Sequence, residues 1–180
     1  MYYVIQVKTG KEQKAIEDII KNNHSHDPHF DVFAPYRKEK RKYKGEEKEV
    51  IQRCFPGYIF VETDDVKQLF VDLYWTPGFT KLLGREADTN NFVPLNADES
   101  RMIDILYSRN TNRITEISNI EVKEGQIVRV LDGPLSLLGL EAKIKKVDLH
   151  KRKVVVEYML CHRLVTSEIG INIITDIINK

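Results

Sequence analysis

The chain has 180 residues, of which 42% are hydrophobic and 31% charged, with a formal net charge of +1. This composition is typical of a globular protein with one or two modest cores, and it excludes a fibrous or intrinsically disordered chain. The sequence has no apolar run of membrane-spanning length and no leader-like start, so we expect a cytoplasmic protein without membrane contact. Cys54 and Cys161 lie far apart in apolar stretches, which predicts reduced thiols.

The first elements along the chain are a strand, a helix and a second strand. Residues 3–7 are β-prone, Thr9 and Glu12 have the spacing of a capping box that opens a helix, and residues 30–35 predict the next strand. The loop 24–29 holds three histidines and an aspartate, which are residue types that bind zinc. Because their spacing is not that of a fixed zinc site, a solvated loop is the favoured interpretation.

The segment 37–53 holds eight basic and four acidic residues, with the basic residues leading. This pattern predicts a hairpin that turns near Lys44 and Gly45 and has a positive first arm. Such an arm can lie along phosphates, and Tyr43 can stack on a base. The alternative is a hairpin whose charges serve only solvation.

The stretch 53–61 is apolar and aromatic, and Pro56 and Gly57 interrupt it. The pattern predicts a backbone reversal between Phe55 and Tyr58, followed by a buried strand. Two interpretations stay open for the rings: core packing, which the pattern alone favours, or an aromatic patch for a partner's apolar helix.

A second helix is expected after Asp64 and Asp65, ending at Trp75, for which the pattern alone favours a core position. A strand at 79–84 and a helix that begins at Asn96 complete this half of the chain. Helices packed against one antiparallel sheet, a compact α+β sandwich, suit residues 1–107.

The polar residues 108–113 predict the start of a linker, and the following sequence is rich in short strands with Gly, Pro and charged turns. We therefore expect a small β-barrel, although the isoleucine-rich stretch 169–178 fits a strand or a helix. Between 143 and 153 the barrel carries six basic residues and one acid, and alternation sends Lys143 and Lys145 outward. This is the footprint of a nucleic-acid-binding face, the alternative being a merely solvated hairpin.

Catalytic patterns are missing from the sequence: it has no metal-ligand pair at fixed spacing, no phosphate-binding glycine loop and no nucleophile motif. We expect no enzyme, no cofactor and no metal.

Several segments occur in a characteristic order: Tyr2–Ile5, Thr9–Glu12, Phe55–Val61, Thr76–Phe79, and Gly125–Val130 followed by Asp132-Gly133-Pro134. Together these segments resemble the NusG family of transcription elongation factors. The resemblance implies a ferredoxin-like α/β plait at 1–107 (the NGN domain, which binds RNA polymerase), a linker at 108–120 and an SH3-like KOW β-barrel at 121–180.

The resemblance also implies partners and site residues. The clamp helices of RNA polymerase would bind Tyr3, Phe55, Pro56 and Tyr58, with Trp75 and Thr76 near the opposite side of the cleft, which reverses the core preference for Phe55 and Tyr58. Residues expected near upstream DNA are Lys38, Lys40, Arg41, Lys42 and Lys44. We expect a monomer.

Within the family, the Gly-Pro-Leu turn, the stretch Gly139–Glu141 and the run Lys146–Arg152 are most similar to the LoaP branch of antiterminators. This similarity implies an operon-specific antiterminator whose KOW domain binds a structured leader RNA. The RNA-binding residues would be Lys143, Lys145, Lys146, His150, Lys151, Arg152 and Lys153. Ala142 stands where the family pattern has the glycine that marks the KOW motif, which is a departure from that pattern.

Two alternatives remain. A housekeeping NusG would use its barrel for proteins such as ribosomal protein S10 or Rho, and the leucines at 135, 137 and 138, where such members favour aromatics, argue against it. A ribosome-associated KOW protein would bind RNA without needing the Phe55–Tyr58 patch.

Overall fold

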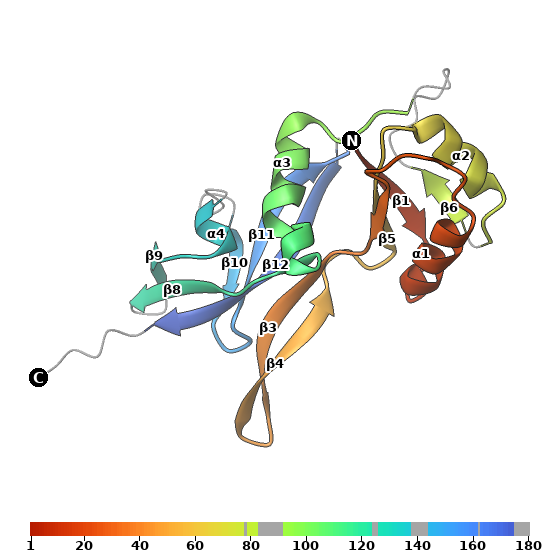
Figure 1. Ribbon diagram of the computed structural model, residues 1–180. Helices are drawn as coiled ribbons and strands as arrows, with labels where there is room; N and C mark the ends of the chain where they lie inside the picture. Colours follow the sequence, from red (N-terminus) through yellow and green to blue (C-terminus); the bar gives the residue numbers. More distant parts are fainter. Residues whose placement is uncertain (78, 83–91, 124–125, 138–143, 162, 175–180) are drawn as a thin grey trace, which may run out of the picture. The chain divides into compact units, whose positions relative to one another are not determined.

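The structure is a computed structural model that describes residues 1–77, 79–82, 92–123, 126–137, 144–161 and 163–174 (Figure 1). The fold is mixed α and β, and the chain divides into two compact units. The first unit contains residues 1–35, 55–101 and 160–163, and the second contains 36–54, 102–159 and 164–180. Each unit is thus assembled from segments that are distant in the sequence.

The first unit is built on an antiparallel four-stranded sheet with the strand order β2-β5-β1-β6. Its elements are β1 (Tyr2–Val7), α1 (Glu12–Lys21), β2 (Asp31–Phe33), β5 (Tyr58–Glu62), α2 (Val66–Tyr74) and β6 (Phe79–Leu82). Helix α1 packs against β2 and β5, and α2 packs against β6. The βαββαβ order along the chain is that of the predicted ferredoxin-like plait. The residues at 83 and 84, predicted to continue the β6 strand, lie outside the described residues.

The core of this sheet is centred on β1 and β5. Ile5 and Ile59 face each other in the register and are fully buried. Phe60 is equally buried, and its ring stacks on that of Phe33 with 5.7 Å between the ring centroids. Burial of apolar side chains of this size contributes about 1.5–3 kcal/mol each, so the central strands hold the sheet together.

Two of the predicted helix-capping interactions are present at the starts of α2 and α3. Asp65 caps α2 by accepting a hydrogen bond from the Gln68 N–H at 3.1 Å, as predicted. The predicted pairing of Asn96 with Glu99 is confirmed as a reciprocal capping box, with both bonds at 2.9 Å, at the start of α3 (Ala97–Leu106).

Helix α1 does not use its predicted capping box. Its N-cap is Lys11, which makes no side-chain capping bond. The prediction was wrong because the helix begins at Glu12, whereas the predicted box needs Glu12 at the third helical position. The Glu12 carboxylate accepts a hydrogen bond from a distant backbone group, the N–H of Gly57, at 2.7 Å.

The second unit combines two sheets. One has the order β4-β3-β7 and the other the order β10-β11-β12-β8-β9, in which β12 and β8 pair in parallel. The strands are β3 (Tyr36–Tyr43), β4 (Glu46–Arg53), β7 (Ile114–Thr115), β8 (Ser118–Lys123), β9 (Gln126–Val130), β10 (Ile144–Asp148), β11 (Lys153–Leu160) and β12 (Arg163–Ile174), with the short helices η1 (Arg109–Thr111) and α4 (Pro134–Leu137). The strand-rich C-terminal part agrees with the predicted KOW barrel.

The boundaries of the predicted domains stay a prediction. Residues 108–120, predicted as a linker, contain η1, β7 and the start of β8. The ambiguous tail is a strand up to Ile174, because β12 pairs with β8 there, and residues 175–178 lie outside the described residues. Both cysteines are free, as predicted, and burial raises the pKa of the Cys54 thiol.

Strand β12 passes very close to the hairpin at Gly170. A Cβ atom added there would lie 2.3 Å from the backbone oxygen of Lys38 and 3.2 Å from the Cα of Glu39. Since backbone atoms cannot move aside as a flexible side chain does, only glycine fits at this crossing of β12 and β3.

We predict that Gly170→Ala lowers the free energy of unfolding by about 1–3 kcal/mol, because the added methyl group overpacks the crossing. The measurement is the urea midpoint followed by far-UV circular dichroism. Thr166→Ala, at an exposed position of the same strand, is the matched control and should change stability by less than about 0.5 kcal/mol. Equal midpoints for the two variants would contradict the close crossing.

Candidate polymerase and nucleic-acid interfaces

The chain reverses direction between Phe55 and Tyr58. The Tyr58 N–H donates to the Phe55 carbonyl oxygen at 3.1 Å, and Gly57 has φ of +85°. A proline at the second position and a glycine with positive φ at the third are the features of a type II turn. The predicted backbone reversal is therefore present.

Two contacts fix this turn to the start of the chain. Besides the bond from its N–H to Glu12, Gly57 accepts a hydrogen bond from the Val7 N–H at 2.9 Å. A Cβ at position 57 would lie 2.8 Å from the Thr9 hydroxyl oxygen, so the turn is also sterically enclosed. Because Glu12 is fully buried, its bond to Gly57 is shielded from water and holds the turn in one conformation.

The four predicted contact residues of this region differ in exposure. Tyr3 and Phe55 are buried, and the Phe55 ring centroid lies 5.6 Å from that of Phe60. Pro56 is exposed and Tyr58 is half-buried. In this structure Pro56 and Tyr58 present surface to solvent, while Phe55 and Tyr3 pack within the protein.

The other two predicted contact residues, Trp75 and Thr76, follow the end of α2 and differ in exposure. Trp75 is 73% exposed, and its ring lies edge-on to that of Tyr74 at 5.2 Å between centroids, so the core position favoured by the sequence pattern was wrong. Thr76 is buried, and its hydroxyl donates to the Asp72 carbonyl oxygen and accepts from the Asn22 side chain. Trp75 is available to a partner, whereas Thr76 serves the structure.

The histidine-containing loop is ordered by Asp27. Its Oδ2 accepts hydrogen bonds from the Thr63 hydroxyl at 2.7 Å and the Asp64 N–H at 2.6 Å, and its Oδ1 accepts from the His29 N–H at 2.8 Å. The Thr63 bond is the main reason that the pKa of Asp27 falls to about 2. Within the described part of the chain no group of ligands suited to a metal ion is found.

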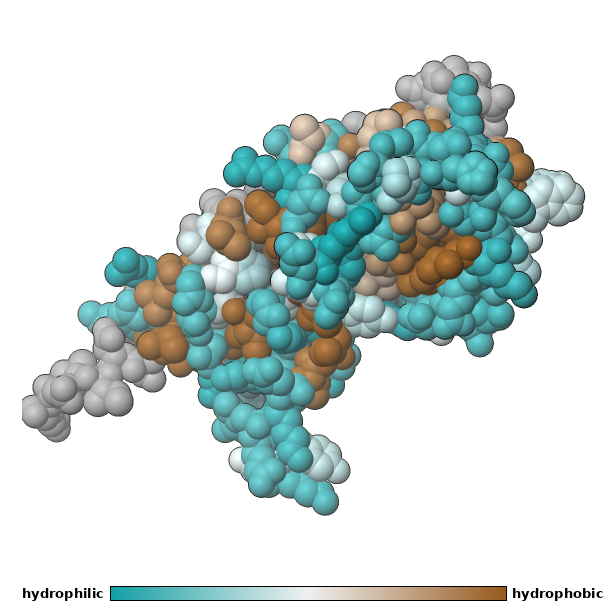
Figure 2. Space-filling model, in the orientation of Figure 1, coloured by the Kyte–Doolittle hydropathy of each residue, from teal (hydrophilic) through white to brown (hydrophobic). Residues whose placement is uncertain are grey.

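The basic segment is a hairpin, as predicted. Strands β3 and β4 pair in continuous antiparallel register from Tyr36 and Arg53 to Tyr43 and Glu46. Lys44 and Gly45 both have positive φ, which defines the two-residue type I′ turn expected at this place. The visible surface toward the tip of the hairpin is largely hydrophilic, and apolar surface lies nearer its base (Figure 2), where Ile51 of β4 is 52% exposed.

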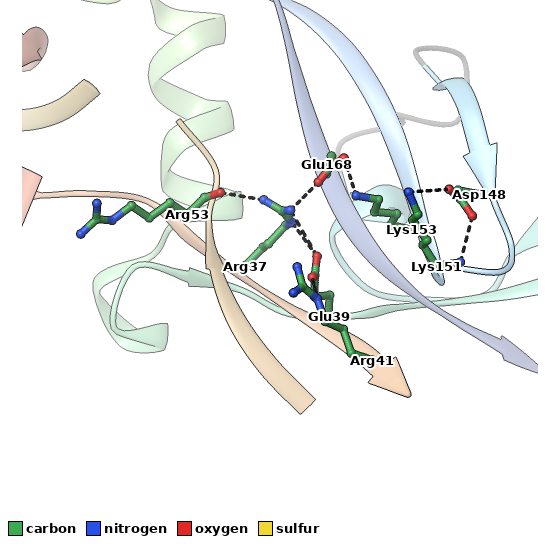
Figure 3. Close-up of polar contacts among 8 residues, drawn as sticks. All are labelled: Arg37, Glu39, Arg41, Arg53, Asp148, Lys151, Lys153 and Glu168. Atoms are coloured by element: carbon green, nitrogen blue, oxygen red, sulfur yellow. Dashed lines mark hydrogen bonds and ion pairs between the residues drawn. The ribbon is translucent and has the colours of Figure 1, made fainter. Parts of the chain in front are cut away.

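A network of charges links the hairpin to the barrel strands of the second unit (Figure 3). Glu39 accepts bonds from the Nε of Arg37 at 3.2 Å and the Nε of Arg41 at 2.6 Å. Arg37 also binds Glu168 on β12, and Glu168 accepts from the Nζ of Lys153 at 2.6 Å. Although burial alone would raise the pKa of Glu168, the bond from Lys153 and the charge of Arg37 hold it below its usual value.

Sequence reasoning missed this network. The available signal was the alternation along β3, which places Arg37, Glu39 and Arg41 on one side, and both Arg37 and Glu39 are buried. The partner Glu168 is 131 residues away from Arg37, and no local pattern identifies it.

The predicted RNA-binding residues fall into two groups. Lys145, Lys146, His150 and Lys151 are exposed, and a register shift in the pairing of β10 with β11 accompanies the exposure of two consecutive lysines. Arg152 and Lys153 are half-buried and form ion pairs with Glu47 at 2.7 Å and with Glu168. Of the exposed group, Lys145 pairs with Glu157 at 2.8 Å, and the Lys151 Nζ lies 4.0 Å from the Asp148 carboxylate. Lys143 lies outside the described residues, as do Ala142 and the stretch Gly139–Glu141.

Of the predicted DNA-proximal residues, Lys38, Lys40 and Arg41 bind other side chains, and the rest are exposed. Lys38 binds Glu116 at 2.7 Å, and this hydrogen bond is the main cause that raises the pKa of Lys38. Lys40 donates to the Asn172 side-chain oxygen at 3.0 Å, and Arg41 pairs with Glu39. Lys42 and Lys44 are exposed.

A sequence profile of a known family, described as transcription termination factor nusG, matches residues 1–106, which is more than half of the chain. The chain belongs to the NusG family. It is a NusG-type transcription termination/antitermination factor. The alternative of a ribosome-associated KOW protein does not explain why the match covers the N-terminal residues 1–106.

Individual NusG proteins from other organisms are similar to this chain over most of their length. The chain is 28% identical to the NusG of Lactococcus lactis, over 87% of this chain and 83% of that protein. It is 26% identical to the NusG of Helicobacter pylori, over 93% of both chains. A solved structure titled "Domain interaction in Thermotoga maritima NusG" has a TM-score of 0.54 at 19% identity, over 94% of this chain and 92% of that one, and supports the fold.

Among the described residues, no helix is both long enough and apolar enough to span a membrane.

We predict that Glu12→Ala lowers the free energy of unfolding by about 1–3 kcal/mol, because the buried Gly57 N–H loses its acceptor. Amide hydrogen exchange read by NMR should show loss of protection at Gly57. Glu12→Gln keeps a carbonyl acceptor and should retain most of that protection. Full protection in Glu12→Ala would mean that the turn does not depend on this bond.

We predict an acid-labile contribution from Asp27. Because its folded pKa is lowered from 3.8 to about 2, its stabilisation is present above about pH 4 and is lost as the pH falls toward 2. Asp27→Asn should lower stability by about 1–2 kcal/mol at pH 7 and flatten the pH dependence in that window. Urea midpoints between pH 7 and pH 2 measure both effects, and parallel curves for the two proteins would contradict the prediction.

Proposed function

We propose that this NusG protein is an operon-specific processive antiterminator of the LoaP type, acting as a monomer in the cytoplasm. It binds the clamp helices of RNA polymerase through the N-terminal domain at 1–107 and structured nascent RNA through the KOW domain at 121–180. The observation that carries the RNA-binding part is the solvent exposure of Lys145, Lys146, His150 and Lys151 along β10 and the turn that follows it. Such a cluster suits the phosphates of a structured RNA.

The polymerase contact is proposed on the turn at Phe55–Tyr58. Pro56 and Tyr58 offer an apolar and aromatic surface, and the Glu12 bond keeps the turn in one conformation. A rigid aromatic residue loses little conformational entropy on binding, which is why such residues often dominate an interface. Trp75 adds a second exposed aromatic side chain in the same unit.

The two contacts reinforce each other through tethering. Once one domain is bound to polymerase, the other meets the emerging RNA at an effective concentration of roughly millimolar, so a modest RNA affinity suffices. By holding the polymerase clamp closed, the bound protein would suppress pausing and release at terminators. Lys42 and Lys44 would then lie near upstream DNA.

A second candidate function is that of a housekeeping NusG whose KOW domain binds proteins. Leu131 is 40% exposed, and its apolar surface suits a protein partner. The two functions differ in whether terminator readthrough depends on a leader RNA.

The test is readthrough of an intrinsic terminator by purified bacterial RNA polymerase. A leader hairpin is first selected by binding of the full chain to a transcribed pool, and templates with and without that leader are then compared. We expect readthrough to rise only on the leader template. An equal rise on both templates would support the housekeeping function, and no rise on either would contradict a role in antitermination.

We predict that Tyr58→Ala weakens polymerase binding by a factor of about 30, the equivalent of a hot-spot loss of about 2 kcal/mol, and leaves RNA binding unchanged. Polymerase affinity is measured by biolayer interferometry, and RNA affinity by fluorescence anisotropy. Ile20→Ala, an exposed apolar position in the same unit, is the matched control. Unchanged polymerase affinity in Tyr58→Ala would remove this turn from the interface.

A further inference from the structure

Strand β3 and the turn between β10 and β11 enclose a cleft of about 390 Å³ within the second unit. One wall is formed by Lys40, Arg41 and Lys42 of the hairpin. The other wall is formed by His150, Lys151 and Lys153 of the barrel turn. The two basic segments that appear separate in the sequence thus line one cavity.

The cleft keeps an excess of positive charge. Its one acidic lining residue, Glu39, is buried, and its two carboxylate oxygens already accept bonds from Arg37 and Arg41. Lys42 is exposed, and Lys151 is 66% exposed, with its Nζ 4.0 Å from the Asp148 carboxylate. These two ammonium groups, one on each wall, are therefore available to an anion from solvent.

The walls are held at a fixed separation before any ligand arrives. Arg37 binds Glu168, the Lys40 Nζ donates to Asn172 at 3.0 Å, and Arg152 pairs with Glu47 of β4 at 2.7 Å. The close crossing at Gly170 adds a steric constraint. A preformed cleft lowers the entropic cost of binding, because its side chains need little further ordering.

We propose that this cleft binds backbone phosphates of RNA, with Lys42 of the hairpin and Lys151 of the barrel turn gripping the strand from opposite sides. The inference rests on the proposed RNA-binding function and deepens it, since it makes the hairpin part of the RNA site. The neighbouring Tyr43 is 61% exposed, and the Nζ atoms of Lys44 and Lys48 lie 5.6 and 5.9 Å from its ring centroid. An unpaired base can stack on this ring where it displaces one of these ammonium groups.

The test measures the salt dependence of RNA binding by the full-length chain. The probe is a fluorescein-labelled RNA hairpin with an unpaired loop, titrated by anisotropy between about 50 and 200 mM KCl. Lys42→Gln and Lys151→Gln alter one wall each, and Lys123→Gln, at an exposed position of β8 outside the cleft, is the matched control. Far-UV circular dichroism verifies that every variant is folded.

We expect Lys42→Gln and Lys151→Gln each to reduce the slope of log affinity against log salt by about 0.7–0.9, with no change in Lys123→Gln. The affinity losses of the two cleft variants should also deviate from additivity in the double variant, because both side chains face one ligand.

An unchanged slope in Lys42→Gln together with a reduced slope in Lys151→Gln would overturn the shared cleft and leave RNA binding by the barrel intact. A Lys42→Gln effect confined to duplex DNA of the same sequence would likewise overturn it. If the unsubstituted chain shows no salt-dependent RNA binding, the proposed function itself fails, and this inference fails with it.

Discussion

The second unit depends on the pairing of buried charges. Arg37 and Glu39 are both almost inaccessible to water, and a buried ion left without a partner costs about 3–5 kcal/mol. Their partners come from β3 itself and from β12, so the hairpin is satisfied only when it lies against the barrel strands. This requirement places the hairpin lysines beside the β10–β11 turn, and the candidate RNA cleft is its geometric result.

In the first unit, a buried charged group is likewise satisfied by a partner that is distant in the sequence, here through one hydrogen bond. Glu12 stands where a helix-capping residue is expected, but its carboxylate is used to hold the turn at Gly57. A residue at the start of α1 thereby determines the conformation of a surface turn that lies 45 residues further along the chain. The conformation of the turn at the proposed polymerase contact is thus determined by a buried residue.

Local signals predicted the parts of this fold that local physics determines. The Asp65 cap, the Asn96–Glu99 box and the Lys44–Gly45 turn are short-range interactions, and all three are present. The errors concern residues whose partners are distant. Sequence periodicity did not reveal that Glu12 binds Gly57 or that Arg152 pairs with Glu47. The error at Trp75 is of another kind, since its ring contacts only the neighbouring Tyr74 among the contacts described above and stays exposed at the end of α2.

The long separation between Arg37 and Glu168 also has a consequence for biosynthesis. The 131 residues between them take on the order of ten seconds to translate at typical bacterial rates. During this interval Arg37 of the newly made hairpin can pair with Glu39 but not yet with Glu168, and β8 has no β12 to pair with. The second unit is therefore completed only when the last strand leaves the ribosome, and its hairpin must stay hydrated until then.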